Sequence, residues 1–219
     1  MRQNVSLAEI SDGHLYKAND MVKADCGGCE GCSQCCRGMG NSIILDPYDV
    51  YRLTTGIGKS MQELLATSVE LNVVDGVILP NLKMQGTGEA CAYLDAAGRC
   101  SIHPYRPGIC RLFPLGRHYE NGGLFYFLQT GECVKENRSK VKVSKWIDTP
   151  ELKRNEQFKL QWHDLLSAMT DRVAGEDEGK QREENLLLLR LFYLLPYEGT
   201  TDFYSQFTER MEHWNEQIG

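Results

Sequence analysis

The chain has 219 residues, of which 42% are apolar and 25% are charged. This length can bury one sizeable core, or a core with a helical appendage, and the composition is typical of a soluble globular protein. The formal net charge of −6 argues against a nucleic-acid-binding function that rests on bulk positive charge.

The sequence gives no sign of membrane insertion. Its first residues, MRQNVSLAEISDGHLY, lack the apolar stretch of a signal peptide. The longest apolar run, LLLLRLFYLL at 186–195, is interrupted by Arg190 and is about half the length that a bilayer span needs. We therefore expect a cytoplasmic protein. Because thiols stay reduced in that compartment, the nine cysteines indicate metal binding or redox chemistry rather than a disulfide framework.

The first feature in chain order is the segment CGGCEGCSQCCRGMG at 26–40, in which five of fifteen residues are cysteine. Its glycines permit the backbone angles of a tight loop in which thiolates can converge. The spacing C-x2-C-x2-C-x3-C that starts at Cys26 matches the bacterial ferredoxin run, except that Arg37 stands where that run has proline. The segment has few other apolar residues, so metal binding is favoured over packing in a core.

Helices and hairpins are predicted after this segment. Asp46 precedes proline and predicts a helix N-terminus, and Ser60-x-x-Glu63 is a capping box for a second helix. Alternating residues around the Asp-Gly pair at 75–76, and again around 121–123, predict two β-hairpins.

The last part of the chain differs in composition. Residues 150–219 contain no cysteine and carry 8 basic and 14 acidic side chains, whereas residues 1–149 carry 16 of each. Thr149 is predicted to cap a helix in which Pro150 takes the first position, and two more helices follow around 180–195 and 201–216. These patterns predict an α+β fold: a small irregular Cys-rich metal-binding unit over 1–148 and a helical, acidic C-terminal extension over 149–219. The extension is expected to cover the Cys-rich unit, with a docking face for a protein partner as the alternative.

The adjacent pair Cys35 and Cys36 raises the question of how many metal centres there are. Neighbouring side chains usually diverge, so the pair is expected to face two centres, or to provide one ligand and one packed or reactive thiol. Eight thiolates would suit two four-cysteine centres. The distant cysteines at 91, 100, 110 and 133 contain no CxxC pair, which favours iron–sulfur chemistry over zinc without excluding zinc.

Two segments together resemble the YkgJ-like family of zinc- or iron-chelating proteins. They are CEGCSQCCRG at 29–38, which contains the CxxCxxCC motif, and CAYLDAAGRCSIHPYRPGICRLFP at 91–114. The resemblance implies metal binding, as an iron–sulfur protein. The best-known relatives are flagellin lysine N-methylases, which are considerably longer chains. The metal ligands that it implies are Cys29, Cys32, Cys35, Cys36, Cys91, Cys100, Cys110 and Cys133, with Cys26 outside the shared motif as an additional ligand.

Three arginines, Arg37, Arg106 and Arg111, lie within a few residues of a cysteine. A [4Fe–4S] cluster held by four thiolates is negatively charged, so nearby cations stabilise it. We expect these side chains to support the bound cluster, with surface solvation or a structural ion pair as the alternative.

Three functions are compatible with these patterns. The first is an iron–sulfur protein with one or two [4Fe–4S]-type centres that acts in electron transfer or supports an enzyme. The second, by analogy with the family that the chain resembles, is a protein-lysine N-methylase-like enzyme with a structural or catalytic metal site, and the third is a zinc-stabilised module that binds a protein partner. The sequence leaves open whether the chain is catalytic.

Overall fold

The computed structural model describes residues 6–27, 32–135 and 137–218, and it confirms the predicted α+β fold with a helical C-terminal part. The α-helices are α1 (Leu7–Ile10), α2 (Pro47–Ile57), α3 (Met61–Thr67), α4 (Gly108–Leu112), α5 (Val143–Ile147), α6 (Leu152–Val173), α7 (Glu178–Leu189) and α8 (Phe203–Ile218). Three shorter turns are the 3₁₀ turns η1 (Gln34–Cys36) and η2 (His103–Tyr105) and the π-helical turn η3 (Arg190–Leu194).

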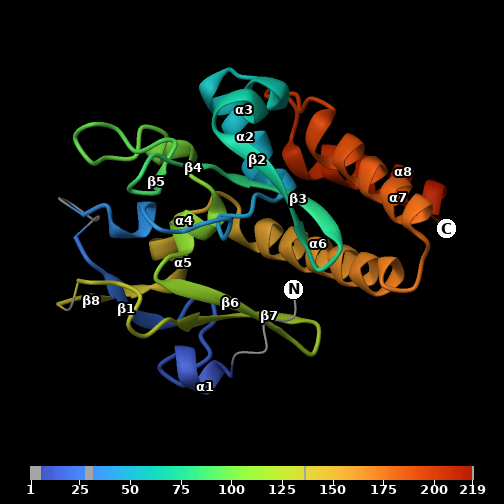
Figure 1. Cartoon of the computed structure of the whole chain (residues 1–219). Coiled ribbons are helices and arrows are strands. Elements are labelled where there is room, and N and C mark those ends of the chain that lie inside the picture. The colour runs from blue at the N-terminus through green and yellow to red at the C-terminus, as the bar shows by residue number, and fades with distance from the viewer. Residues whose placement is uncertain (1–5, 28–31, 136, 219) are drawn as a thin grey trace.

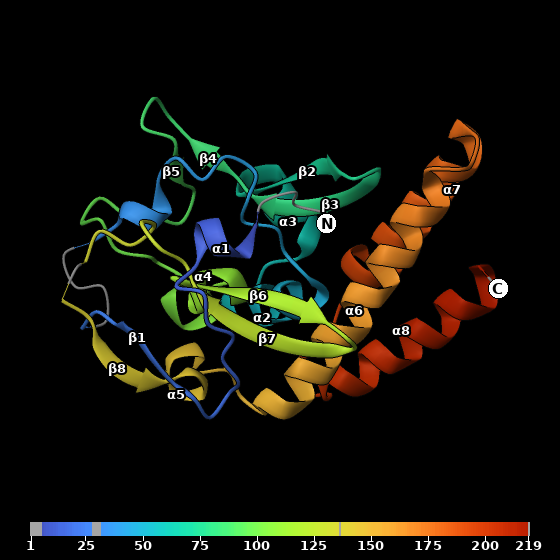
Figure 2. The same ribbon diagram turned by 90° about the horizontal axis from the view of Figure 1, so that it is seen from below.

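The strands form small antiparallel pairs rather than one sheet. They are β1 (Met21–Asp25), β2 (Val69–Val74), β3 (Val77–Leu82), β4 (Met84–Gln85), β5 (Ala90–Cys91), β6 (Leu115–Glu120), β7 (Gly123–Leu128) and β8 (Ser139–Lys142). The pairs are β1–β8, β2–β3, β4–β5 and β6–β7. In Figures 1 and 2 the β1–β8 pair lies at the end of the molecule away from α7 and α8.

The predicted helix N-terminus at Asp46, the capping box at Ser60 and the two hairpins are confirmed. Asp46 and Asp49 form a reciprocal capping box at the start of α2, and Ser60 and Glu63 form one at the start of α3. Asp75 and Gly76 both have positive φ angles in the turn between β2 and β3, as a two-residue hairpin turn requires. The second hairpin turns at positions 121–122, and the glycine at 123 is already the first residue of β7.

The predicted start of the first C-terminal helix is wrong by two residues. The helix α6 begins at Leu152, and Glu151 before it has a φ of 49°. The hydroxyl of Thr149 donates to the carbonyl of Ile147, so it does not cap α6. The cause is the short helix α5, which ends in the left-handed residue Asp148 and forces the chain to turn before a new helix can begin.

Two hydrophobic cores fill the molecule. The larger one joins residues of α2, α3, β2 and β3 to residues of the C-terminal helices, including Leu45, Leu53, Phe158, Phe192 and Phe207. The smaller one lies under β1, β6, β7, α4 and α5. Because the larger core contains residues from both sides of position 148, the C-terminal helices complete it. The division of the chain into two domains at 148/149 stays a prediction.

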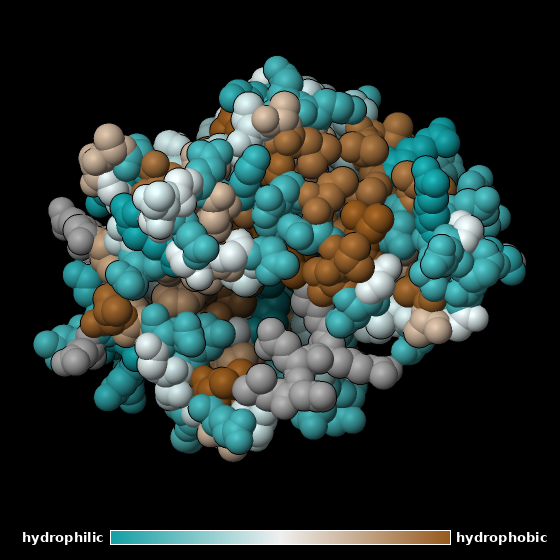
Figure 3. Space-filling model, in the orientation of Figure 1, coloured by the Kyte–Doolittle hydropathy of each residue, from teal (hydrophilic) through white to brown (hydrophobic). Residues whose placement is uncertain are grey.

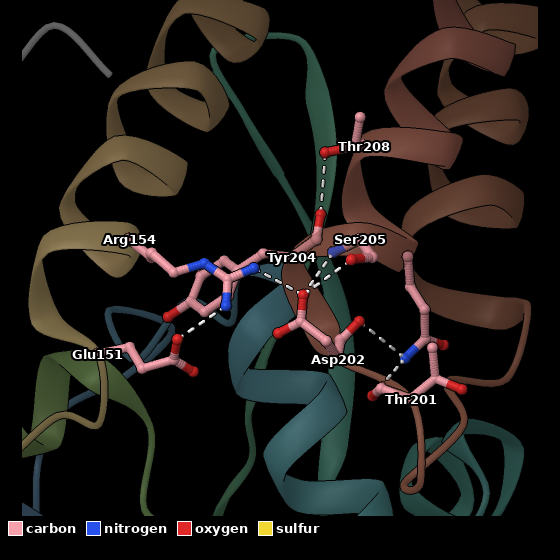
Figure 4. A network of polar contacts seen from close by, with 8 residues as sticks. Glu151, Arg154, Thr201, Asp202, Tyr204, Ser205 and Thr208 are labelled. Atoms are coloured by element: carbon pink, nitrogen blue, oxygen red, sulfur yellow. Dashed lines mark hydrogen bonds and ion pairs between the residues drawn. The ribbon is translucent and has the colours of Figure 1, made fainter.

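The N-terminal ends of α6 and α8 are joined by polar contacts, which Figure 4 shows. Arg154 donates to Glu151 and to Asp202, at 2.7 Å in each case. Asp202 also accepts from the backbone amide and the hydroxyl of Ser205 in the first turn of α8. One carboxylate therefore caps α8 and connects it to α6.

The surface that Figure 3 shows has an apolar area on the face that carries the β2–β3 hairpin. Leu71 and Val73 of β2 are among the exposed large apolar side chains, with 43% and 67% of their surface accessible. None of the helices within the described ranges has the length and apolar character needed to cross a bilayer.

Candidate metal centre

The Cys35–Cys36 pair lies on η1, next to the strand that carries Cys91. The amide of Cys36 donates to the carbonyl of Ser33 in the 3₁₀ turn. Directly after the turn, Arg37 forms a β-bridge with Ala90, the residue before Cys91. Backbone hydrogen bonds thus hold the first Cys-rich segment against β5, more than fifty positions further along the chain.

Cys91 and Cys100 are connected by a compact turn. The amide of Leu94 donates to the carbonyl of Cys91 at 2.8 Å, and Leu94 forms a β-bridge with Cys100. The carboxylate of Asp95 accepts from the backbone amides of Ala97 and Arg99, which fixes the reversal between the two cysteines.

Cys110 lies on the short helix α4, between the two hydrophobic cores. Its neighbour Ile109 and Cys110 itself pack against the larger core, while Leu112 belongs to the smaller one. The guanidinium of Arg111 donates to the carbonyls of Pro104 and Asp148, at 2.7 and 2.6 Å. These bonds hold α4 to the preceding loop and to the end of α5.

Four thiols from these segments lie close enough together that the charge of one changes the pKa of another. We call Cys36, Cys91, Cys100 and Cys110 the inner thiol group. Burial raises the pKa of Cys110, and the neighbouring Cys91 and Cys100 raise it further, since several thiolates close together repel one another. Burial likewise raises the pKa of Cys91 and that of Cys100. Without a cation between them, these groups favour the neutral thiol, and a bound metal would reverse that preference.

A second group of thiols lines a small pocket. We call Cys26, Cys32, Cys35 and Cys133 the outer thiol group, and Phe113 and Pro114 form part of the same wall. Cys29, which was predicted as a ligand, lies outside the described residues. Within the described ranges no disulfide is formed, and no three Cys, His, Asp or Glu side chains already surround a single point as ligands of one ion. The thiols are therefore gathered in two neighbouring places but not closed around a point.

The adjacent pair does not diverge in the way that the sequence suggests. Its two side chains are hydrogen-bonded, which raises the pKa of Cys35 and lowers the pKa of Cys36. The reason is the 3₁₀ turn, because only an extended backbone points successive side chains to opposite faces. Cys36 lies near Cys91, Cys100 and Cys110, and so does Cys35, which also lines the outer pocket and therefore lies at the boundary between the two groups.

Cations accompany the inner thiol group. The charge of Arg106 lowers the pKa of Cys100 and that of Cys35, against the larger raising effects of burial and hydrogen bonding. Arg52 and Arg106 both lie near Arg111 and lower its pKa, which burial also lowers. In the described part of the chain, the buried Nε atoms of Arg106 and Arg111 have no hydrogen-bond partner.

Arg106 combines an unpaired buried Nε donor with nearby thiols, and a negatively charged metal–thiolate centre would satisfy that donor, so the residues present fit a metal. Of the three arginines predicted to support it, Arg106 lies beside thiols and Arg111 is engaged with backbone carbonyls. Arg37 is exposed.

Sequence reasoning missed two buried charged residues, Asp49 and Lys159, which are 3% and 4% exposed. From the sequence alone, Asp49 looks like an ordinary residue at the start of a helix. Lys159 looks like a polar position on an amphipathic helix. Burial raises the pKa of Asp49 to about 6 and lowers the pKa of Lys159 to about 7. Lys159 forms an ion pair with Asp46, and Asp49 accepts from the amide of Gly108.

A comparison with known protein families also indicates metal binding by the Cys-rich part of the chain. Residues 28–139 match the family model CxxCxxCC, described as "Putative zinc- or iron-chelating domain". The chain belongs to this family. The match covers just over half of the sequence and includes every predicted metal ligand except Cys26. No curated protein and no solved structure matches the chain. Membership supports a metal cofactor and leaves the choice between zinc and iron open.

Proposed function

We propose that this protein is an iron–sulfur protein that holds a [4Fe–4S]-type centre at the inner thiol group and acts in electron transfer or in support of an enzyme. The observation that carries the proposal is that Cys36, Cys91, Cys100 and Cys110, from four separate segments of the chain, lie near one another and near Arg106. Four thiolates are the ligand set of such a cluster, and bound to it they carry net negative charge.

The cationic surroundings favour an anionic centre. No carboxylate within the described residues forms an ion pair with Arg52 or Arg106, and the carboxylate near Arg111, that of Asp148, is 3.8 Å away and 89% exposed. The buried carboxylate of Asp49 also lies near Arg52 and Arg111, so these arginines share one buried negative charge, and a negatively charged centre would balance the remaining positive charge. Such cations would also raise the reduction potential of a bound cluster.

The proposal further places a second centre at the outer thiol group. Cys26, Cys32, Cys35 and Cys133 line one pocket, and four thiols again suffice for one cluster or one zinc ion. A bound group there would lie next to the first, because Cys35 and Cys36 are consecutive residues of η1. Two neighbouring redox centres would suit electron transfer through the protein.

Anaerobic purification tests the proposal, with the absorbance spectrum recorded and iron, acid-labile sulfide and zinc quantified per chain. We expect a brown protein whose visible absorbance bleaches on reduction, with about four irons per centre and matching sulfide. A colourless protein with stoichiometric zinc would contradict the iron–sulfur assignment and support a zinc-stabilised module. A chain with neither metal would contradict both.

A further inference from the structure

A chain of buried polar contacts runs from the C-terminal helices to the helix that carries Cys110. It begins on α6, where the ammonium group of Lys159 forms an ion pair with the carboxylate of Asp46. The side chain of Lys159 is 4% exposed, so this pair is shielded from water. Lys159 belongs to the part of the chain that contains no cysteine.

The contacts continue through the start of α2. The amide of Asp49 donates to the carboxylate of Asp46 at 3.0 Å, and the amide of Asp46 donates to the carboxylate of Asp49 at 3.2 Å. The other carboxylate oxygen of Asp49 accepts from the amide of Gly108 at 2.7 Å. Each oxygen of Asp49 is therefore used, one within α2 and one on α4.

The bond from Gly108 supplies what α4 lacks. The first amides of a helix need acceptors from outside the helix, and the residue before α4 is Pro107, which offers no capping side chain. Asp49, 59 positions earlier in the chain, provides that acceptor. Since α4 has only five residues, the contact at Gly108 fixes the place of Cys110 two residues later.

The surroundings of Gly108 leave little freedom. A Cβ atom on this residue would lie 3.1 Å from Nη2 of Arg117 and 3.4 Å from both Oδ1 of Asp49 and Nζ of Lys159. Side chains from β6, α2 and α6 thus surround one glycine at the start of α4. If these contacts served only to neutralise buried charge, they would not have to meet at the segment that carries Cys110.

We propose that Asp49 and Lys159 are positioning residues that hold Cys110 in place for metal binding, so that docking of α6 and binding of metal stabilise each other. This inference rests on the proposed metal site and adds a role for the C-terminal helices. Coupling of this kind is reciprocal: if α6 increases the affinity for metal, metal must stabilise the docked α6 by the same factor. Residues behind metal ligands commonly change metal affinity by about 10- to 100-fold.

The test compares the metal-free full-length wild type with three variants, Asp49→Ala, Asp49→Asn and Lys159→Met. Each protein is titrated anaerobically with Co²⁺, which reports thiolate coordination through its charge-transfer absorbance, and each metal-free form is unfolded in urea. We expect Asp49→Ala and Lys159→Met to lower the Co²⁺ affinity by about tenfold or more. Asp49→Asn keeps an acceptor oxygen for the Gly108 amide and should retain more affinity than Asp49→Ala.

Asn185→Ala is the matched control. Asn185 is also buried, and it connects α7 to the β2–β3 hairpin through the carbonyl of Gly76 and the amide of Ile78, away from Cys110. This variant should lose stability in urea but keep the Co²⁺ affinity of the wild type.

Two results would overturn the inference while leaving the metal site in place. One is an unchanged Co²⁺ affinity in Asp49→Ala and Lys159→Met. The other is an equal loss of affinity in Asn185→Ala, which would show a general effect of stability. Should Asp49→Ala fail to fold, Lys159→Met against Asn185→Ala still decides the question. A wild type that binds no Co²⁺ would overturn the inference as a statement about binding of a single metal ion, whereas iron and sulfide per chain test the proposed function separately.

Discussion

Cys35 and Cys36 are adjacent in sequence, and both lie near the thiols of Cys91, Cys100 and Cys110. Cys35 in addition lines the pocket that contains Cys133. Both residues lie on the 3₁₀ turn η1, so any two centres formed here would be close neighbours. This arrangement makes the metal content of single serine variants informative.

We expect Cys36→Ser and Cys133→Ser each to remove about half of the metal bound per chain, because each removes one thiolate from one group of four. The double variant should bind almost none. Iron, sulfide and zinc per chain are measured after anaerobic purification, with the far-UV circular dichroism spectrum as a control for folding.

Either of two outcomes would contradict the two-centre assignment. A Cys36→Ser protein with its full metal content would show that the inner thiol group is not a separate centre. Loss of all metal in both single variants would show one shared centre instead of two.

At the scale of elements, the C-terminal helices are fixed to one another by charged contacts at their ends. Although burial raises the pKa of Asp202, hydrogen bonds from Arg154 and Ser205 lower it below its ordinary value of 3.8. A carboxyl group whose pKa is lowered by folding stabilises the folded state above its unfolded pKa. That stabilisation is lost as the pH falls through the folded pKa.

Asp202→Asn should therefore destabilise the metal-free protein at pH 6 by up to about 1 kcal/mol, which is the range for exposed ion pairs. Asparagine can still cap α8, so the variant removes the charge and keeps the cap. The difference in the free energy of unfolding from wild type should shrink as the pH falls below about 4. Urea unfolding at several pH values measures it, and high salt should reduce it at pH 6.

A difference that stays constant with pH would show that Asp202 acts through geometry alone. Glu212→Gln on the same helix is a control for the loss of one exposed negative charge, and its effect should be small at every pH.

At the scale of the whole molecule, the position of the larger core decides how independent the Cys-rich unit is. Its residues include Leu45, Leu53 and Leu82 from the first part and Phe158, Phe192 and Phe207 from the helices. Removal of the helices would expose one side of this core to water. Each Å² of exposed apolar surface lowers the free energy of unfolding by about 25 cal/mol.

We therefore expect a protein of residues 1–148 to lack a cooperative thermal transition, in contrast to the full chain. Circular dichroism melting and the dispersion of amide signals in NMR spectra measure this, with and without added metal. Cooperative unfolding of the shorter protein without metal would support an independent domain that ends at 148. Cooperative unfolding only with metal would show that the metal can replace the helices as a source of stability.

Local chemistry in the sequence determined the helix N-terminus at Asp46, the capping box at Ser60, the hairpin turns at Asp75 and Asn121, and the family to which the chain belongs. Each depends on residues close together in the chain: a cap needs an acceptor side chain beside free amides, and a tight turn needs residues that tolerate positive φ. The spacing of the cysteines was enough to identify the family, because the cysteine motifs of the family are specific.

Only the tertiary structure decided how the thiols are grouped, why Asp49 and Lys159 are buried, and where α6 begins. A β-bridge between Arg37 and Ala90 brings together the segments of Cys36 and Cys91 across more than fifty positions, and Lys159 pairs with Asp46 across more than a hundred. Burial and ion pairing between distant segments depend on packing of the complete chain, which local propensity does not contain. The turn at Asp148 shows the same limit over a short range, because α5 before it displaced the helix start that Thr149 and Pro150 predict.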